Sequence, residues 1–282
     1  WGFSMWAIIG GSGFESFDGI EELEELDRQT PFGECSSGLR RIRFGRHECL
    51  FLSRHGRHHE LLPSEINYRA NIFALKKYGA RKVISVSAVG SLQKELAPGD
   101  LVIPSQYIDR TKGVRTHTFL GGGLVGHVSL AKPTWEGAAK RVQEMAFDFK
   151  VHHGKTYVCI EGPSFSTQSE SASYRQMGAD IIGMTNFPEY ALAREAGLCY
   201  LPASFVTDYD CWDSTIEHVT LQVVLETMRA NNKKAVRFIE ALLNANPGED
   251  LACRDGGLKT SLMTDIRTLS PAVKSWLEIL NV

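Results

Sequence analysis

Two aspartates, Asp208 and Asp210, stand two residues apart in "SFVTDYDCWDS", directly after the apolar run of residues 198–206. Such a run predicts a buried strand. Because side chains alternate in an extended chain, both carboxyls are expected on one face at the end of that strand. A carboxyl buried beside a second carboxyl keeps its proton to a higher pH, which is what a general acid requires. A turn or an exposed loop is the alternative interpretation of the same spacing.

Small and hydroxyl-bearing residues follow two other predicted strands. Ser12 lies in "GGSGF", residues 10–14, where backbone N–H groups and the hydroxyl could hold a phosphate. The third glycine of the dinucleotide-binding pattern is absent, and a plain tight turn explains the segment equally well. Ser87 and Ala88 lie in "SVSAVGS", residues 85–91, whose small side chains would let a ligand approach the backbone. An ordinary transition from strand to loop is the alternative there.

A third strand end, "SRHGRHHE" at residues 53–60, carries two arginines and three histidines. His55 and His59 are four residues apart, but the segment lacks the glutamate and the helix of the H-E-x-x-H zinc motif. Arginine binds oxyanions through two N–H groups, so an anion site is favoured over a metal site. An exposed basic loop remains the alternative. Phe165 in "EGPSF" could stack on a planar ring, although the sequence alone favours a place in the core.

These residues need a sheet to bring them together. Predicted strands alternate with predicted helices along the chain, which indicates an α/β fold with a central mixed, partly parallel sheet flanked by helices. We expect one domain over residues 5–282, with residues 1–4 a tag remnant before Met5. Ligands in such folds bind at the carboxyl ends of the strands, where the residues above are expected.

Composition excludes several classes of function. With 31 Lys and Arg against 33 Asp and Glu, the net charge of −2 argues against a nucleic-acid partner. Apolar runs are too short to span a membrane. Six cysteines occur without a C-x-x-C pair, so we expect free buried thiols and a cytoplasmic location. No metal site is expected.

The order of the motifs is more specific than any one of them. The chain contains "RHGRHHELLPSEINYRANIFALK", "SAVGSLQKELAPGDLVIPSQYIDRT", "IEGPSFSTQSES", "MTNFPEYALAREAG" and "TDYDCW". Over about residues 7–225 this series resembles the 5′-methylthioadenosine phosphorylases, in the trimeric branch of the purine nucleoside phosphorylase superfamily. The resemblance implies a nucleoside phosphorylase-like fold. It also implies cleavage of methylthioadenosine by inorganic phosphate, giving adenine and 5-methylthioribose 1-phosphate with no further cofactor.

The resemblance also implies roles for residues at matching positions. Asp208 would protonate purine N7, Asp210 would bind the 6-amino group, and Phe165 would stack on the base. The remaining positions are Ser12, Arg54, His55, Ser87, Ala88 and Thr185 for phosphate, Met184 for the ribose, and His127, Leu221, Val224 and Leu225 for the 5′-methylthio group. His127 would reach the site of a neighbouring subunit, which implies a homotrimer with shared active sites. From spacing alone, the helical stripe of the last three positions is more typical of a core.

The chain departs from the family pattern at Ser164, Asn186 and Phe187, which leaves room for a changed base loop and ribose edge. The glycine-rich "LGGGLVG" at residues 120–126 is expected to be a mobile loop. Three alternatives stay open: a purine nucleoside phosphorylase acting on adenosine, inosine or guanosine, a nucleosidase that uses water, and an inert nucleoside binder. Asp208 argues against 6-oxopurines, for which that superfamily usually has asparagine. The phosphate-binding set Ser12, Arg54, His55 and Thr185 argues against a nucleosidase that uses water.

Overall fold

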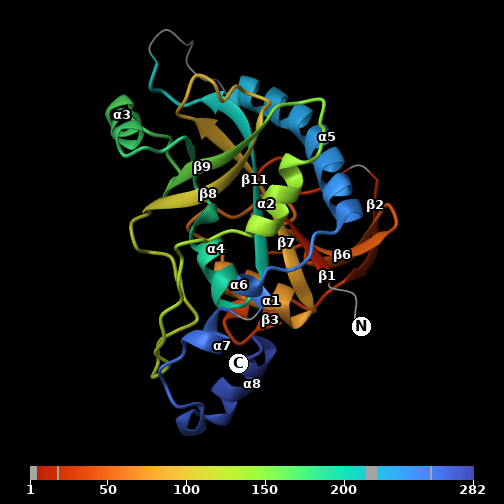
Figure 1. Ribbon diagram of the computed structural model, residues 1–282, viewed down its shortest axis with the longest axis vertical. Helices are drawn as coiled ribbons and strands as arrows, with labels where there is room; N and C mark the ends of the chain where they lie inside the picture. The colour runs from red at the N-terminus through yellow and green to blue at the C-terminus, as the bar shows by residue number, and fades with distance from the viewer. Residues whose placement is uncertain (1–4, 18, 214–220, 255) are drawn as a thin grey trace.

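The computed structural model describes residues 5–17, 19–213, 221–254 and 256–282 (Figure 1). The expected tag remnant, residues 1–4, lies outside this part. In chain order the strands are β1 (Met5–Gly10), β2 (Ile20–Glu25), β3 (Gln29–Thr30), β4 (Gly33–Glu34), β5 (Arg40–Phe44), β6 (His47–Ser53), β7 (Ala80–Ser91), β8 (Leu101–Arg110), β9 (Val151–Ile160), β10 (Ile181–Gly183) and β11 (Cys199–Tyr209). The helices are α1 (Tyr68–Lys77), α2 (Glu136–Gln143), α3 (Gln168–Gln176), α4 (Asn186–Glu195), α5 (Leu221–Ala245), α6 (Leu251–Arg254), α7 (Leu258–Ser261), the 3-10 helix η1 (Ile266–Thr268) and α8 (Pro271–Ile279).

The main sheet has nine strands in the order β10-β9-β8-β11-β7-β1-β6-β5-β2. Its centre, β11-β7-β1-β6, is parallel, and these strands are nearly continuous apolar runs because both of their faces are covered. β10 also pairs antiparallel with β7, so that β7, β11, β8, β9 and β10 form a closed ring of hydrogen-bonded strands. The α/β prediction with a mixed sheet is confirmed; the closure of part of that sheet was not predicted.

Alternating residues of β1 show how the helices cover the sheet. Ala7 and Ile9 pack into a core with α1, α4 and α8, whereas Trp6 and Ile8 pack into a second core with α2 and α5. The alternation of side chains along a strand accounts for this division. The carboxyl ends of the parallel strands stay uncovered between the two layers. Among the described residues, no helix combines the length and the apolar character needed to cross a membrane.

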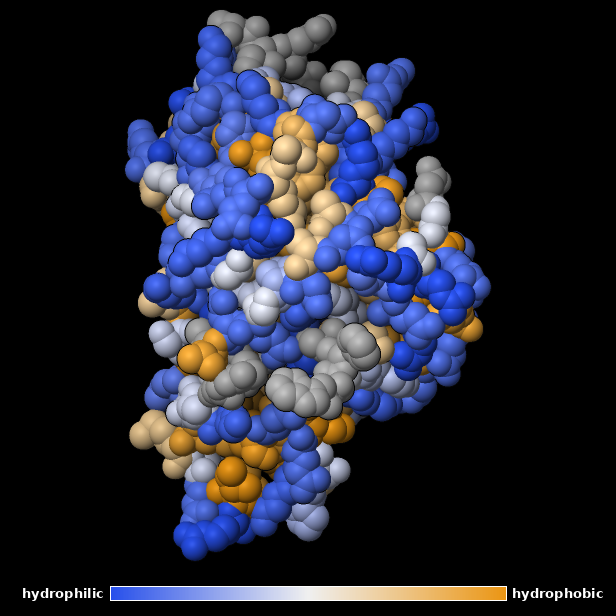
Figure 2. All heavy atoms as spheres, turned by 45° about the vertical axis from the view of Figure 1, so that its right-hand side comes forward, coloured by the Kyte–Doolittle hydropathy of each residue, from blue (hydrophilic) through white to orange (hydrophobic). Residues whose placement is uncertain are grey.

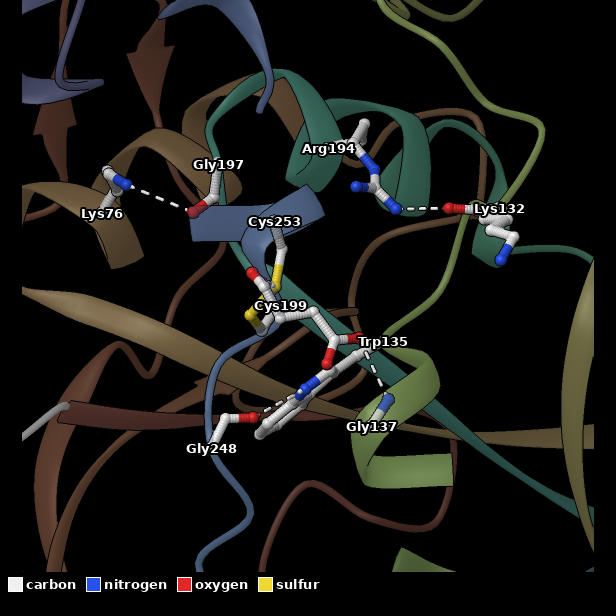
Figure 3. Close-up of a disulfide and its surroundings, with 10 residues drawn as sticks. Lys76, Lys132, Trp135, Gly137, Arg194, Gly197, Cys199, Gly248 and Cys253 are labelled. Carbon is white, nitrogen blue, oxygen red and sulfur yellow. Dashed lines mark hydrogen bonds between the residues drawn. A yellow bond between two sulfur atoms is a disulfide. The ribbon is translucent and has the colours of Figure 1, made fainter. Parts of the chain in front are cut away.

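The cysteine prediction is wrong for one pair. Cys199, at the start of β11, forms a disulfide with Cys253 in α6, and their Cα atoms lie 5.1 Å apart (Figure 3). The chain returns past the amino end of β11 after α5, which brings together two residues that are 54 positions apart. The other four cysteines are free thiols, as expected, and three of them are buried.

This disulfide fastens the C-terminal segment to the sheet, and its loss has a measurable cost. A crosslink over 54 residues restricts the unfolded chain, so the Cys253→Ser variant should lose about 2–4 kcal/mol of unfolding free energy. Urea unfolding with and without reductant checks this. Reductant should destabilise the unsubstituted protein and leave the variant unchanged. Equal free energies of unfolding for the variant and the unsubstituted protein, both without reductant, would contradict the prediction.

The glycine-rich segment 120–126 is more ordered than expected. Gly121 pairs with Leu124 in an isolated bridge, and Gly126 pairs with Leu262 of the C-terminal segment. Leu124 is buried in the same core as α8. The backbone N–H of Met263 also donates to the carbonyl of Val125. The segment is therefore held between the core and the C-terminal segment, and the expectation of a mobile loop is wrong.

Candidate active site

A cavity of about 930 Å³ lies at the carboxyl ends of the parallel strands. Its wall is formed by residues after β1, β6, β9 and β10, by the carboxyl-terminal parts of β7 and β11, and by one side of α5. Eleven of the sequence-predicted positions line it: Ser12, Arg54, His55, Ser87, Ala88, Phe165, Met184, Thr185, Asp208, Asp210 and Leu225. The structure therefore brings the anion-binding candidates and the aspartate pair into one space. Within the described residues, no three His, Cys, Asp or Glu side chains are arranged to hold a metal ion.

Arg54 is the buried centre of the anion-binding side. Its side chain is fully buried, and its Nε and Nη2 atoms donate to the carboxylate of Glu189 at 2.6 and 2.8 Å. Nη2 also donates to Ser85 Oγ at 2.6 Å, and Nη1 donates to the carbonyl of Val86 at 3.0 Å. Burial alone would lower the pKa of Arg54, but the Glu189 carboxylate more than offsets this, so the pKa is raised and the cation persists.

This arrangement changes the expected mode of anion binding. Arginine has five N–H donors, and four of those of Arg54 already have partners. In the described part of the chain, one N–H on the Nη1 edge is left for an anion, so the expectation of bidentate anion binding is wrong for Arg54. Gly11 makes this edge accessible, because a Cβ there would collide with Arg54 Nη1 and lie 2.8 Å from the Val86 carbonyl oxygen.

His55 is a neutral member of the same wall. Its Nδ1 lies 2.9 Å from the carbonyl oxygen of Leu61, and because a carbonyl only accepts, Nδ1 carries the proton. Burial lowers the pKa of His55 to about 4, and the charge of Arg54 adds to the effect. Nε2 is then an acceptor, suited to a hydroxyl of the phosphate or the ribose. The His59 ring stacks on the His55 ring with 4.6 Å between centroids, and His59 Nδ1 lies 2.7 Å from Glu15 Oε1. His55 is therefore the histidine that offers an acceptor to the cavity, whereas His59 pairs with an acid.

Asp208 and Asp210 both face the cavity from the end of β11, as their spacing predicts. Burial raises the pKa of Asp208 to about 6, and the charge of Asp210 adds a smaller rise. The expectation that repulsion between the pair helps to retain the proton is therefore secondary to burial. Burial also raises the pKa of Asp210. Within the described residues its Oδ2 makes no hydrogen bond of normal geometry, although the hydroxyls of Ser171 and Ser166 lower the pKa of Asp210 against the effect of burial. A donor on a ligand would give Oδ2 a partner.

Phe165 and Met184 border the same end of the cavity. Phe165 is 76% exposed and lines the cavity, so the sequence-based preference for the core is wrong and its ring is free to stack. Met184 follows β10, and its carbonyl accepts a hydrogen bond of 2.6 Å from the buried Arg115. Its sulfur packs against Gly162, where a Cβ would lie 2.5 Å away. Met184 is thus placed by contacts outside the cavity.

The wall at α5 is mixed rather than apolar. Leu225 and Met228 line the cavity together with the polar side chains of Arg229, Asn232 and Lys233. Of the expected apolar stripe, Leu225 lines the cavity as predicted. The side chains of Leu221 and Val224 lie outside the part that the structure describes.

His127 does not line the cavity of its own chain. It lies exposed after the segment 120–126, and its backbone N–H donates to the carbonyl of Ser261 in α7. The expected role of this residue therefore requires a second chain.

The three departures from the family pattern lie outside the cavity wall. Ser164 is exposed, while Asn186 is fully buried and accepts a hydrogen bond from Tyr107. The Phe187 ring packs against Tyr190 and the carbonyl of Phe187 accepts from Arg115. The expectation that Asn186 and Phe187 alter the ribose edge is not supported by their positions, because both face the core behind the site.

Sequence reasoning missed three residues that position the site: Glu189, Arg115 and Thr207. Glu189 is 1% exposed on α4 and binds Arg54. Arg115 is buried against Glu161 and donates to backbone carbonyls beside Met184. A signal for Glu189 existed, because "PEYALA" places one acid in an otherwise apolar helix, and a buried acid needs a cationic partner.

Comparison with known proteins agrees with this site. The family model described as "Phosphorylase superfamily" matches residues 6–244. The chain is 39% identical to an S-methyl-5′-thioadenosine phosphorylase of Geobacter sulfurreducens over 97% of this chain and 96% of that one. It superimposes with a TM-score of 0.87 and 42% identity on a methylthioadenosine phosphorylase from an antarctic soil metagenomic library, covering 98% of both chains. A methylthioadenosine phosphorylase of Schistosoma mansoni in complex with adenine gives a TM-score of 0.76 at 34% identity, covering 99% of this chain and 98% of that chain. The chain therefore belongs to the phosphorylase superfamily, within the family of the methylthioadenosine phosphorylases.

Proposed function

We propose that this enzyme cleaves 5′-methylthioadenosine with inorganic phosphate, giving adenine and 5-methylthioribose 1-phosphate. The observation that carries the proposal is that an aspartate pair, with Asp210 buried and Asp208 partly buried, faces the same cavity as the Arg54 anion site. A base that leaves from a ribosyl carbon needs a proton, and the sugar that loses it needs a nucleophile. The cavity offers a group for each task. Inorganic phosphate is a co-substrate, and no other cofactor is needed.

The reaction follows from these positions. Phosphate bound at Ser12, Arg54 and Ser87 attacks C1′, and one of its oxygen atoms forms the new bond. The C1′–N9 bond breaks, and its electron pair moves to the purine. Asp208 transfers its proton to N7, so that adenine leaves as a neutral base and Asp208 becomes a carboxylate. Phosphate near C1′ also stabilises the positive charge that develops on the sugar.

Asp210 supports a preference for 6-aminopurines. Its buried Oδ2 can accept a hydrogen bond from a 6-amino group, whereas a 6-oxo group would bring an acceptor against it. Adenosine is the second candidate substrate, because Arg229 and Asn232 line the α5 wall and suit a 5′-hydroxyl better than an apolar wall would. Cleavage of methylthioadenosine returns its base and its sulfur-bearing sugar for reuse, so a role in purine and methionine salvage is part of the proposal.

Base release from paired substrates tests the proposal. We expect adenine from methylthioadenosine only when phosphate is present, together with an equal amount of sugar 1-phosphate. Faster release from adenosine would favour the second candidate, and faster release of hypoxanthine from inosine would contradict the role of Asp210. Release without phosphate would indicate a nucleosidase. No release from any nucleoside would indicate an inert binder.

We further propose a homotrimer with shared active sites. His127 lies away from its own cavity, and Val114, Val125 and Met263 are exposed by 51–70%. Figure 2 shows hydrophobic side chains gathered at the lower end of the molecule, where α7 and α8 lie in Figure 1. A particle mass of three chains by light scattering is the expected result.

Small nucleoside substrates support a cytoplasmic location, although the disulfide removes the argument from free cysteines.

A further inference from the structure

Thr207 interrupts the regular pairing of β11 with β7. Val206 pairs with Val89 and Asp208 pairs with Gly90, so Thr207 is the extra residue of a β-bulge. In a regular strand the side chains of residues 207 and 208 would point to opposite faces, but a bulge re-aims a side chain. Thr207 Oγ1 accordingly lies 2.7 Å from Asp208 Oδ2, and Thr207 is only 4% exposed. The bulge therefore brings a buried hydroxyl to the carboxyl next to it.

The two carboxyl oxygens of Asp208 have different surroundings. Oδ2 faces the Thr207 hydroxyl, whereas Oδ1 lies beside Gly90, where a Cβ would be 3.2 Å from it. Gly90 and Thr207 both line the cavity, so the two oxygens differ in their hydrogen bonding: of the two, Oδ2 is the one with a hydroxyl partner. The Thr207 hydroxyl has one proton and a second acceptor, the Val89 carbonyl at 3.2 Å. The shorter contact is the one to Asp208.

We propose that Thr207 is a positioning residue for the general acid: its hydroxyl donates to Asp208 Oδ2 and thereby holds the transferable proton on Oδ1. This inference rests on the proposed function, because it requires Asp208 to be the acid. When the proton leaves, Oδ2 becomes part of a carboxylate, and the hydrogen bond from Thr207 becomes stronger.

Thr207 changes the pKa of Asp208 in the direction opposite to that of burial and of the Asp210 charge. Burial raises the pKa of Asp208 most, Thr207 lowers it through its hydrogen bond, and Asp210 raises it slightly. In the described part of the chain, β7 and β10 contribute Val89, Gly90 and Ile182 at this point, none of which titrates, and α5 lines the same cavity with the basic side chains of Arg229 and Lys233. Removal of the hydroxyl should therefore move the titration of Asp208 to higher pH without the help of any other group.

The Thr207→Val variant keeps the shape of the side chain and removes the hydroxyl, and the Thr207→Ser variant keeps the hydroxyl. The pH profile of kcat/KM should fall on its basic side at a pH about one unit higher in Thr207→Val than in the unsubstituted enzyme. Its kcat should fall roughly 10-fold, because the proton is no longer confined to Oδ1. Thr207→Ser should retain the original profile. Profiles of Thr207→Val and the unsubstituted enzyme that superimpose would overturn the inference, as would a Thr207→Ser profile that matches Thr207→Val.

A second measurement does not depend on turnover. The carboxyl ¹³C signal of Asp208, identified by its loss in Asp208→Asn, reports the titration of this group in the ligand-free enzyme. We expect it to titrate at higher pH in Thr207→Val, and identical titration curves would refute the hydrogen bond. If the unsubstituted enzyme released no adenine, the proposed function would fail, whereas the titration would still decide whether Thr207 donates to Asp208.

Discussion

Replacement of Asp208 by asparagine is expected to lower kcat/KM for methylthioadenosine roughly 10²- to 10⁴-fold, the usual contribution of a general acid. The asparagine amide fills the same space but has no proton to transfer to N7. The unsubstituted enzyme should lose kcat/KM as the pH rises through about 6, because the carboxyl loses its proton there. The variant should show no such fall. Phosphate binding, measured by calorimetry, should be unchanged, and near-normal turnover would exclude Asp208 as the proton donor.

The same substitution should stabilise the protein at neutral pH. Folding raises the pKa of Asp208 from 3.8 to about 6, so the folded state binds this proton more tightly than the unfolded state. The resulting stabilisation is complete below about pH 4 and is lost as the pH rises through about 6. Asparagine avoids the buried charge, so at pH 7.5 the variant should gain about 1–3 kcal/mol, with no gain at pH 4. Asp148→Asn, at an exposed acid, is the matched control and should show no pH-dependent gain.

Replacement of Glu189 by glutamine should have the largest effect on stability. It leaves the fully buried guanidinium of Arg54 without its carboxylate, and loss of one partner of a buried ion pair costs about 3–5 kcal/mol. Arg54 would also lose one of the two hydrogen bonds that Glu189 accepts from it, because the glutamine amide has a single oxygen and its NH2 group would face a guanidinium N–H. We therefore expect a higher KM for phosphate as well as a lower free energy of unfolding, measured by urea titration.

A double variant separates the two effects. Arg54→Met combined with Glu189→Gln removes the unpaired charge, so it should recover most of the lost stability, because an apolar replacement of a buried pair is often neutral. Phosphate-dependent turnover should be lost in the double variant, since the cation itself is gone. A double variant as unstable as Glu189→Gln would show that the destabilisation comes from packing rather than from the unpaired guanidinium.

Much of the site could be predicted from strand ends. Ser12, Arg54, Ser87 and Asp208 each follow or end a strongly apolar strand, and parallel strands end at one edge of a sheet. That rule is enough to bring residues separated by nearly 200 positions into one cavity, as the structure confirms. The same rule does not predict the hydrogen-bond partner of each side chain, because those partners depend on how the helices pack on the sheet.

The features that escaped prediction depend on contacts between distant segments. Glu189 meets Arg54 only because α4 packs against β11 and α1. Cys253 meets Cys199 because of the route that the chain takes after α5. The bulge at Thr207 requires the register of both β11 and β7, and neither strand shows it alone. The sequence pattern of each segment by itself predicts neither the Glu189–Arg54 pair, nor the disulfide, nor the bulge.

The closed ring of β7, β11, β8, β9 and β10 has a consequence for how the molecule tolerates change. A ring has no free edge along which a strand can slip, so the register that carries Asp208 is locked from both sides. β2, with its charged sequence, is instead the open margin of the sheet. Amide hydrogen exchange should therefore be slowest around the ring and fastest in β2. Insertions and substitutions should therefore be tolerated best in β2, where they do not displace Asp208.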